Sequence, residues 1–212
     1  MISNTLLIKI LNNIAITIKE NKEYLTHLDS VIGDSDHGFN MNKGFNEVKQ
    51  KLESLQNKDC GTILKNIAMT LISKVGGASG PLYGTAFLKA SVVVKDKYEI
   101  SEEDSIKMFD EAIKGIISRG KAKQGDKTML DALTPAYQIY KDSINKGDSI
   151  EIAILQAQKA AYEGVEYTKT IKATKGRASY LGDRSIGHQD PGATSSYLIL
   201  KSISNTLNNI NK

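Results

Sequence analysis

The sequence has little cysteine, proline or tryptophan, and each shortage limits what the protein can be. Its 212 residues include one cysteine, three prolines and no tryptophan. The single cysteine, Cys60, rules out an intramolecular disulfide framework and any metal or iron–sulfur site built from several cysteines. It also suits a reducing cytoplasm, which is the compartment we expect. So few prolines leave room for long uninterrupted helices.

Long apolar runs and blocks of basic residues are missing too. No apolar stretch reaches the roughly 18–20 residues that a membrane span needs. We also expect no signal peptide at Met1–Leu11, which has neither a basic start nor a long apolar core. The 28 basic and 24 acidic residues leave a formal charge of +4, without the Lys/Arg block that marks a nucleic-acid arm. We therefore expect neither a membrane nor a nucleic acid as a partner.

Apolar residues recur at helical spacing along almost the whole chain. No stretch shows the alternation of a convincing strand, and Val92–Val94 is the most strand-like. Ser101 with Asp104 resembles a capping box with Asp in place of Glu, and we expect Asp190 to cap a last helix that has Pro191 in its first turn. The predicted helical faces lie within residues 6–18, 41–55, 63–75, 81–94, 101–116, 129–140, 150–165 and 191–210. Because the connections are short, we predict an all-α fold: one domain over residues 1–212, an antiparallel bundle of about eight helices.

The first of three segments that interrupt this pattern, Leu28–Asn40, carries Asp29, Asp34 and Asp36. Converging carboxylates repel one another, so a fold holds them together with a cation, and hard oxygen ligands indicate Mg²⁺ or Ca²⁺. A helix that begins after Asp36 would favour a phosphate at its N-terminus. On spacing alone an equally acceptable interpretation makes Asp34 and Asp36 turn and N-cap residues.

The other two interruptions, Gly76–Gly84 and Lys175–Gly192, also contain phosphate-binding residue types. The glycine-rich one runs into a helix, where its N–H groups could cradle phosphate and Ser79 could cap the helix. By itself a tight turn between two helices is the better interpretation. The second contains Arg177, and arginine suits phosphate oxygens. Gly115–Ala122 nearly spells a phosphate-binding P-loop, but it lacks the final Ser/Thr, so we predict a helix end at Gly120.

Four isolated residues have simpler interpretations. We expect His27 on a helix surface and Cys60 as a buried or cap-proximal residue rather than a nucleophile. His37 lies inside the acidic cluster, where it could touch a phosphate or orient an aspartate. His188 is either a site residue or a polar loop residue.

Taken together, the interrupting segments resemble one family, the nucleotide-binding L subunits of dihydroxyacetone kinases. Asp29–Asn40 matches D-x-x-x-G-D-x-D-H-G-x-N, and Gly125–Asp131 matches G-[DE]-K-T-M-x-D. Gly76–Gly84 and Gly176–Gly192 resemble G-G-A-S-G-P-L-Y-G and G-R-A-S-Y-L-G-x-R-S-I-G-H-x-D-P-G. The likeness covers essentially the whole chain in order. One departure is Ser35, which stands where the family usually has glycine and puts the local metal geometry in question.

The resemblance implies an antiparallel barrel of eight helices that binds ADP and two Mg²⁺ ions at one end. It implies that Asp29, Asp34 and Asp36 hold the metals and that Arg177 is catalytic. The residues it implies in nucleotide binding are His37, Gly38, Phe39, Asn40, Ala78, Ser79, Gly120, Met129, Arg177, Asp190, Pro191 and Gly192. Gly120 and Met129 would line the adenine pocket, and residues 175–189 could form a lid.

The function implied by the resemblance is that of a phosphotransferase subunit. ADP would stay bound, be charged to ATP by a phosphohistidine of an M subunit, and phosphorylate dihydroxyacetone held on a K subunit, giving dihydroxyacetone phosphate. One alternative is a kinase domain that exchanges ATP and serves another acceptor. The fatty acid kinase nucleotide domain is such a case. Its motif is D-x-D-T-G, and this chain has His37 at the position of the threonine. A nucleotide-loaded regulatory subunit that binds a transcription factor, and a homodimer, also stay open. A metal-stabilised helical scaffold would bind no nucleotide.

Overall fold

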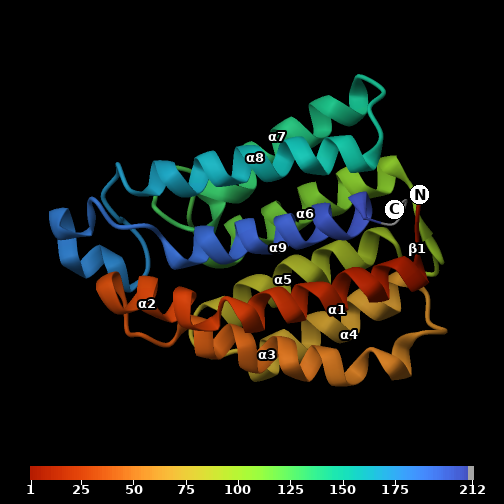
Figure 1. The fold of residues 1–212 in the computed structure, drawn as a ribbon, viewed down its shortest axis with the longest axis horizontal. Coiled ribbons are helices and arrows are strands. Elements are labelled where there is room, and N and C mark those ends of the chain that lie inside the picture. The colour runs from red at the N-terminus through yellow and green to blue at the C-terminus, as the bar shows by residue number, and fades with distance from the viewer. Residues whose placement is uncertain (210–212) are drawn as a thin grey trace.

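The computed structural model describes residues 1–209, which form nine α-helices, two 3₁₀-helices and one short pair of strands. Figure 1 shows the long helices side by side along the long axis of the molecule. The α-helices are α1 (Asn4–Glu20), α2 (Lys22–Ile32), α3 (His37–Lys51), α4 (Cys60–Lys74), α5 (Ser79–Val93), α6 (Glu102–Gly120), α7 (Met129–Asn145), α8 (Ile150–Thr168) and α9 (Pro191–Asn208). The shorter elements are β1 (Ile2–Ser3), β2 (Glu99–Ile100), η1 (Glu53–Leu55) and η2 (Arg177–Ser185).

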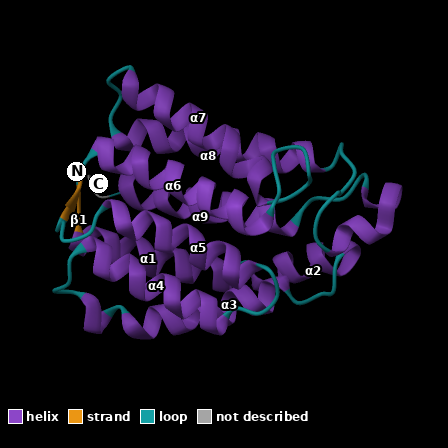
Figure 2. Ribbon diagram, turned by 180° about the vertical axis from the view of Figure 1, so that it is seen from behind, coloured by secondary structure: helices purple, strands orange, loops and turns teal. Residues whose placement is uncertain are grey.

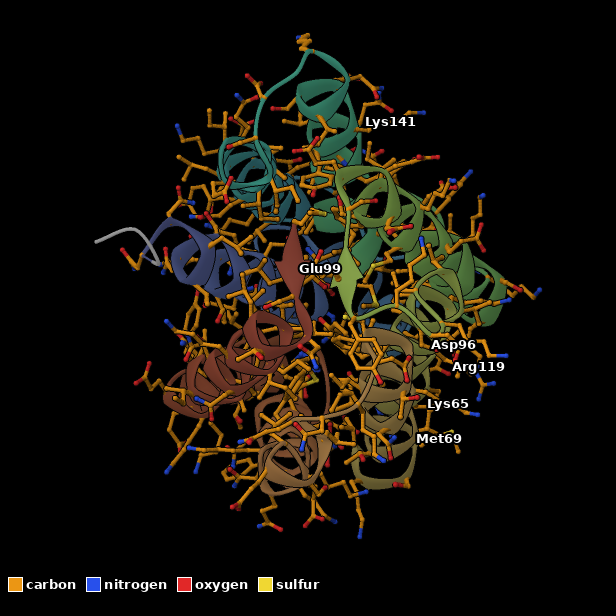
Figure 3. The ribbon with its side chains drawn as sticks, turned by 90° about the vertical axis from the view of Figure 1, so that its right-hand side faces the viewer. Lys65, Met69, Asp96, Glu99, Arg119 and Lys141 are labelled. Atoms are coloured by element: carbon orange, nitrogen blue, oxygen red, sulfur yellow. The ribbon has the colours of Figure 1, made fainter. Side chains whose placement is uncertain are left out.

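Eight of the α-helices in this described part of the chain form a closed ring. Going around it, α1 packs against α3, α3 against α4, α4 against α5, α5 against α6, α6 against α7, α7 against α8, α8 against α9, and α9 against α1. Figure 3 looks along these helices from the end that carries the chain termini. The predicted all-α barrel of about eight helices is therefore confirmed, and α2 lies outside the ring against α3 and α9.

The ring is built from amphipathic helices that turn their apolar stripes inward. The largest fully buried apolar side chains are Phe45, Leu11, Ile14, Ile18, Leu25, Met41, Ile63, Ile67, Leu71, Leu130 and Val48. Inside the ring, apolar side chains of α1, α5, α6 and α9 also line a cavity of about 230 Å³. No helix within residues 1–209 is long and apolar enough to cross a membrane.

The predicted helix ends are confirmed where capping chemistry fixes them. The Ser101 hydroxyl accepts a hydrogen bond from the Asp104 N–H, and the Asp104 carboxylate accepts one from the Ser101 N–H, which makes the capping box at the start of α6. Asp190 accepts from the Ala193 N–H and caps α9, with Pro191 in the first turn. The sequence that nearly spells a P-loop is the C-terminal end of α6, as predicted, and it ends at Gly120.

Two elements differ from the prediction. Leu28–Asn40 was expected to be irregular, but most of it belongs to α2 and α3, and only Gly33–Asp36 break the helices. Helix α2 buries only Leu25, Asp29 and Ile32, which is too few for a periodic signal. The strand pair β1–β2 was not predicted either, because two residues per strand are too short for alternation to be seen.

The ends of the predicted segments also shift slightly. Val92 and Val93, in the most strand-like stretch, are part of α5. The last helix was predicted to reach Ile210; α9 ends at Asn208, and Ile210 lies outside the described residues.

Candidate functional site

The segments that interrupt the helical pattern meet at the end of the barrel opposite the termini, where Figure 2 shows several connecting loops. They surround a cavity of about 470 Å³. The predicted site residues in its wall are Asp29, Asp34, Asp36, His37, Ala78, Ser79, Gly120, Met129, Arg177, Asp190, Pro191 and Gly192. Segments more than 150 positions apart in the sequence therefore form one concave site.

The three predicted metal-ligating carboxylates converge at this cavity. Asp29, Asp34 and Asp36 each offer an oxygen, and these atoms all lie within 4.8 Å of one another. The buried Asp29 carboxylate accepts hydrogen bonds from the backbone N–H groups of Asp36 (2.9 Å) and His37 (3.1 Å). Asp29 thereby fixes the start of α3 and brings the other two carboxylates close to itself.

The electrostatics of this cluster favour a hard cation. Burial raises the pKa of Asp36, and the neighbouring charge of Asp34 raises it further. Asp36 stands at the N-cap position of α3, but its side chain caps no N–H group within residues 1–209. The alternative in which Asp36 serves only as a cap therefore finds no support in its contacts. The donor set fits Mg²⁺, which is bound by hard carboxylate oxygens.

The turn that carries these carboxylates is tightly constrained. A Cβ atom on Gly33 would collide with the Asp29 carboxylate, so a side chain has no room there. Ser35, between Asp34 and Asp36, has a φ of 65°, a left-handed backbone that glycine adopts far more easily. The departure from the family pattern at Ser35 therefore falls on a position where the geometry favours glycine.

Helix N-termini gather around the same cavity. In an antiparallel barrel every second helix begins at the same end, and here α3, α5, α7 and α9 contribute His37, Ser79, Met129 and Pro191 from their first turns. The first N–H groups of a helix have no partner within it, and the helix dipole makes this end positive. The dipoles of four such ends favour an anion in this cavity, although side chains already accept hydrogen bonds from the first turns of α3, α7 and α9.

The glycine-rich segment enters this arrangement differently from one expectation. Helix α5 begins at Ser79 itself, and the N-cap position belongs to Ala78. The Ser79 hydroxyl therefore does not cap the helix and instead lies 3.0 Å from Nδ1 of His37.

His37 is held by hydroxyl groups on both sides. Its Nε2 lies 2.9 Å from the Ser195 Oγ, which in turn lies 2.7 Å from the Tyr83 hydroxyl. Burial lowers the pKa of His37 to about 4, although the charge of Asp29 opposes this, so the ring is neutral at pH 7. The ring thus orients hydroxyls, while the His37 backbone N–H binds Asp29.

Apolar side chains form another part of the wall, from Ile116, Leu82, Ala122, Met129 and Leu130, beside Gly120. Such a surface suits a flat aromatic ring.

Arg177, from η2, extends across the mouth of the cavity. Its Nε lies 2.7 Å from the Asp34 carboxylate, and both side chains are partly exposed. Asp190 also lines the cavity, and burial raises its pKa to about 7.

Three predicted nucleotide-binding residues lie outside the cavity wall that residues 1–209 form. Gly38 packs tightly against Lys22 and Thr26 of α2, where a Cβ atom would collide with both. The half-exposed Phe39 has the Lys22 ammonium 4.7 Å from its ring centre. Asn40 lies next to Gly76. The role of these three residues in nucleotide binding stays a prediction.

The isolated residues fall where the simpler interpretations put them. His27 is exposed on α2, as predicted. Cys60 is buried at the start of α4, and burial raises its pKa to about 11, so it is not a reactive thiolate. His188 is exposed and lies outside the cavity wall formed by the described residues.

Sequence reasoning missed three residues of the site: Tyr83, Ser195 and Lys127. Tyr83 and Lys127 line the cavity, and Ser195 joins Tyr83 to His37. Lys127 is 1% exposed, and its ammonium donates to backbone carbonyls. A signal for Lys127 was present, because it stands inside the Gly125–Asp131 block.

Comparison with known proteins agrees with this geometry. The family model for the DAK2 domain matches residues 31–205. The chain is 47% identical over 194 residues to the "PEP-dependent dihydroxyacetone kinase, ADP-binding subunit DhaL" of Escherichia coli, covering 92% of each chain. It is 43% identical to the "PTS-dependent dihydroxyacetone kinase, ADP-binding subunit DhaL" of Lactococcus lactis, covering 88% of each.

Among solved structures, the chain resembles the dihydroxyacetone kinase of C. freundii in complex with AMP-PNP and Mg²⁺. The TM-score is 0.71 at 23% identity, and the match covers 94% of this chain and 33% of that one. At this identity the likeness shows a shared fold.

Proposed function

The chain belongs to the DAK2 domain family, and we propose that it is the ADP-binding subunit of a PTS-dependent dihydroxyacetone kinase. Support comes from relatives of that name, which match this chain over about nine tenths of both lengths. The bound nucleotide would act as a phosphoryl relay from a phosphohistidine of the M subunit to dihydroxyacetone on the K subunit. The single cysteine of the chain, Cys60, suits the reducing cytoplasm, and we place the relay in that compartment.

The observation that carries the proposal is the convergence of Asp29, Asp34 and Asp36 within 4.8 Å at a cavity ringed by helix N-termini. Mg²⁺ is commonly bound through carboxylates together with the phosphates of a nucleotide. Three carboxylates offer enough oxygens to share between two ions, and we include two Mg²⁺ in the proposal. The ions would neutralise the diphosphate and the phosphoryl group in transfer.

The residues of this chain would act mainly by position and charge. Phosphoryl transfer requires alignment and neutralisation more than covalent help from the protein. Asp29, held by two backbone N–H groups, sets the geometry of the metal-binding carboxylates. The first turns of α3, α5 and α9 would contact phosphate oxygens. Gly120 and Met129 would lie against adenine.

Arg177 is the residue we assign to catalysis. It lies at the mouth, 2.7 Å from one of the metal-binding carboxylates, where a phosphoryl group would enter and leave. A guanidinium there stabilises the charge that develops on the transferring oxygens. Its pairing with Asp34 holds it at the mouth before a phosphoryl donor arrives.

The partners in this proposal are the K and M subunits. Exposed apolar side chains occur on the elements beside the mouth: Phe39 on α3, and Tyr180 on η2, which also carries Arg177. Such side chains suit the docking of another subunit over the open site.

The test is the nucleotide content of the purified protein. The protein is denatured without added nucleotide, and the released material is identified by chromatography. We expect stoichiometric ADP that does not exchange with labelled ATP, and its loss in Asp34→Asn. The matched control, Asp183→Asn, removes an exposed carboxylate of η2 and should keep its ADP. ADP that washes out readily would indicate an ATP-exchanging kinase domain instead. No binding, even with added Mg²⁺, would refute the proposal.

A further inference from the structure

Lys127 is a buried cation to which the proposed phosphoryl transfer gives no role. It lies in the loop between α6 and α7, next to the N-cap residue Thr128, and is 1% exposed. Its φ is 61°, in the left-handed region that favours glycine. Burial lowers its pKa, while the charges of Asp190 and Asp131 favour the ammonium form. The fold keeps a lysine where both the backbone and the surroundings make it costly.

The ammonium group lies in a cage of four backbone carbonyls. Its Nζ donates to the oxygens of Thr168 (2.6 Å), Ser185 (2.6 Å) and His188 (2.5 Å), and it lies 3.3 Å from that of Ile171. These carbonyls belong to the last residue of α8, the turn after it, the last residue of η2, and the approach to α9. One cation therefore joins both ends of the α8–α9 connection (residues 169–190).

Other hydrogen bonds close the connection around the same point. The Asp190 N–H donates to the Thr168 hydroxyl (3.0 Å), and the Gly187 N–H donates to the Lys169 carbonyl (2.7 Å). Asp126, beside Lys127, accepts from the Thr174 hydroxyl (2.6 Å). The loop from α6 to α7 thus holds the connection directly before Lys175.

The connection carries the groups that face the nucleotide cavity. Lys175–Ala178 and Asp190 line the wall, and Arg177 reaches Asp34 across the mouth. Without a donor at Lys127, the Thr168 and Ser185 carbonyl oxygens would each lose a buried hydrogen bond, which destabilises the ordered loop.

We propose that Lys127 is a positioning residue that closes the base of the α8–α9 connection and so presents Arg177 to the nucleotide phosphates. This inference rests on the proposed function only for the identity of the ligand. In this role the Lys127 ammonium binds backbone carbonyl oxygens and does not contact a phosphate.

The experiment compares Lys127→Met, which keeps the apolar stem, with Lys127→Gly, which suits the left-handed backbone and empties the cage. The matched control is Lys123→Met, an exposed lysine of the same loop. Two rates are measured: ADP release, and tryptic cleavage within the connection, at Lys172, Lys175, Arg177 and Arg184, in nucleotide-free protein.

We expect Lys127→Met to release ADP about 10–100-fold faster, because the wall residues Lys175–Ala178 and Asp190 lose their support together, and this is the range typical when a supporting contact behind a ligand is lost. Cleavage within the connection should accelerate as well, and Lys123→Met should match the unsubstituted protein. In Lys127→Gly, n-butylammonium should slow both rates toward their original values, because it restores a cation to the cage. The neutral isostere n-butanol should not, and equal slowing by both compounds would show that Lys127 only fills space.

Cleavage in Lys127→Met at the original rate would overturn the inference. So would a Lys127→Gly protein whose two rates do not change when n-butylammonium is added. If Lys127→Met is too unstable to purify, the response of Lys127→Gly to the amine decides. Cleavage is measured without nucleotide, so it remains informative if the unsubstituted protein carries no ADP, a result that would refute the proposed function alone.

Discussion

Substitution of Asp36 in the carboxylate cluster should change the stability of the protein in opposite directions with and without metal. Asp36→Asn keeps the shape of the side chain and removes one of three charges whose oxygens lie within 4.8 Å. At that separation two unit charges in water repel by about 0.9 kcal/mol. Asp36 has two such neighbours, so relief of repulsion adds about 1–2 kcal/mol to the free energy of unfolding. For a chain of this size that raises Tm by about 2–8 °C.

With Mg²⁺ and ADP present, Asp36→Asn should instead be less stable than the unsubstituted protein. A ligand present at about 100 times its Kd stabilises the folded state by about 2.7 kcal/mol. Asp36→Asn removes a metal ligand and forfeits most of this gain. Thermal unfolding followed by circular dichroism, once in EDTA and once with Mg²⁺ and ADP, measures both effects, with Asp183→Asn as the control. A lower Tm for Asp36→Asn in EDTA would refute the reasoning, because the carboxylate would then be stabilising without a cation.

The same substitution has a pH signature. The folded-state pKa of Asp36 is raised above its ordinary value of 3.8, chiefly by burial. A raised carboxyl pKa contributes stability that is present below the unfolded pKa and lost as pH rises through the folded one. The advantage of Asp36→Asn in EDTA should therefore be largest at neutral pH and shrink in acid.

Three further predictions concern single positions. Ser35→Gly should raise the free energy of unfolding by about 0.5–1 kcal/mol in chemical denaturation, because glycine relieves the positive φ of 65°. Asp190→Asn should gain stability over the unsubstituted nucleotide-free protein as pH rises through about 7, where the buried carboxyl ionises, and a flat difference in Tm between pH 5 and 8 would contradict this. Arg177→Gln should retain ADP yet lower phosphoryl transfer about 10²–10³-fold, and an equal loss of ADP would instead indicate a role in nucleotide retention.

Much of the fold was predictable because its helices are strongly amphipathic. Faces such as Leu6–Ile18 repeat apolar residues at every turn, and capping residues such as Ser101 and Asp190 mark the ends. Apart from the helical position expected for His27, the extent of α2 was missed because this helix lies outside the ring and buries few side chains. The β1–β2 pair was missed because its partners lie far apart in the sequence and each strand is two residues long.

The family was predictable from its motifs, and the DAK2 match confirms that resemblance. The side-chain contacts within the site could not be predicted from the sequence. Whether the His37 ring faces an aspartate or two hydroxyls depends on how α3, α5 and α9 pack together. The role of Lys127 depends on carbonyls contributed by residues 168–188, which show no side-chain pattern. Such contacts follow from the tertiary structure rather than from local sequence.

The most direct test of the central claim is to follow the phosphoryl group through the bound nucleotide. The purified chain, with its ADP, is mixed with K and M subunits, phosphoenolpyruvate, the general phosphotransferase proteins and dihydroxyacetone. Hexokinase and glucose are added to consume any free ATP. We predict that dihydroxyacetone phosphate forms at the same rate with and without this trap. Formation that stops when the trap is present, or that requires added ATP, would contradict the account.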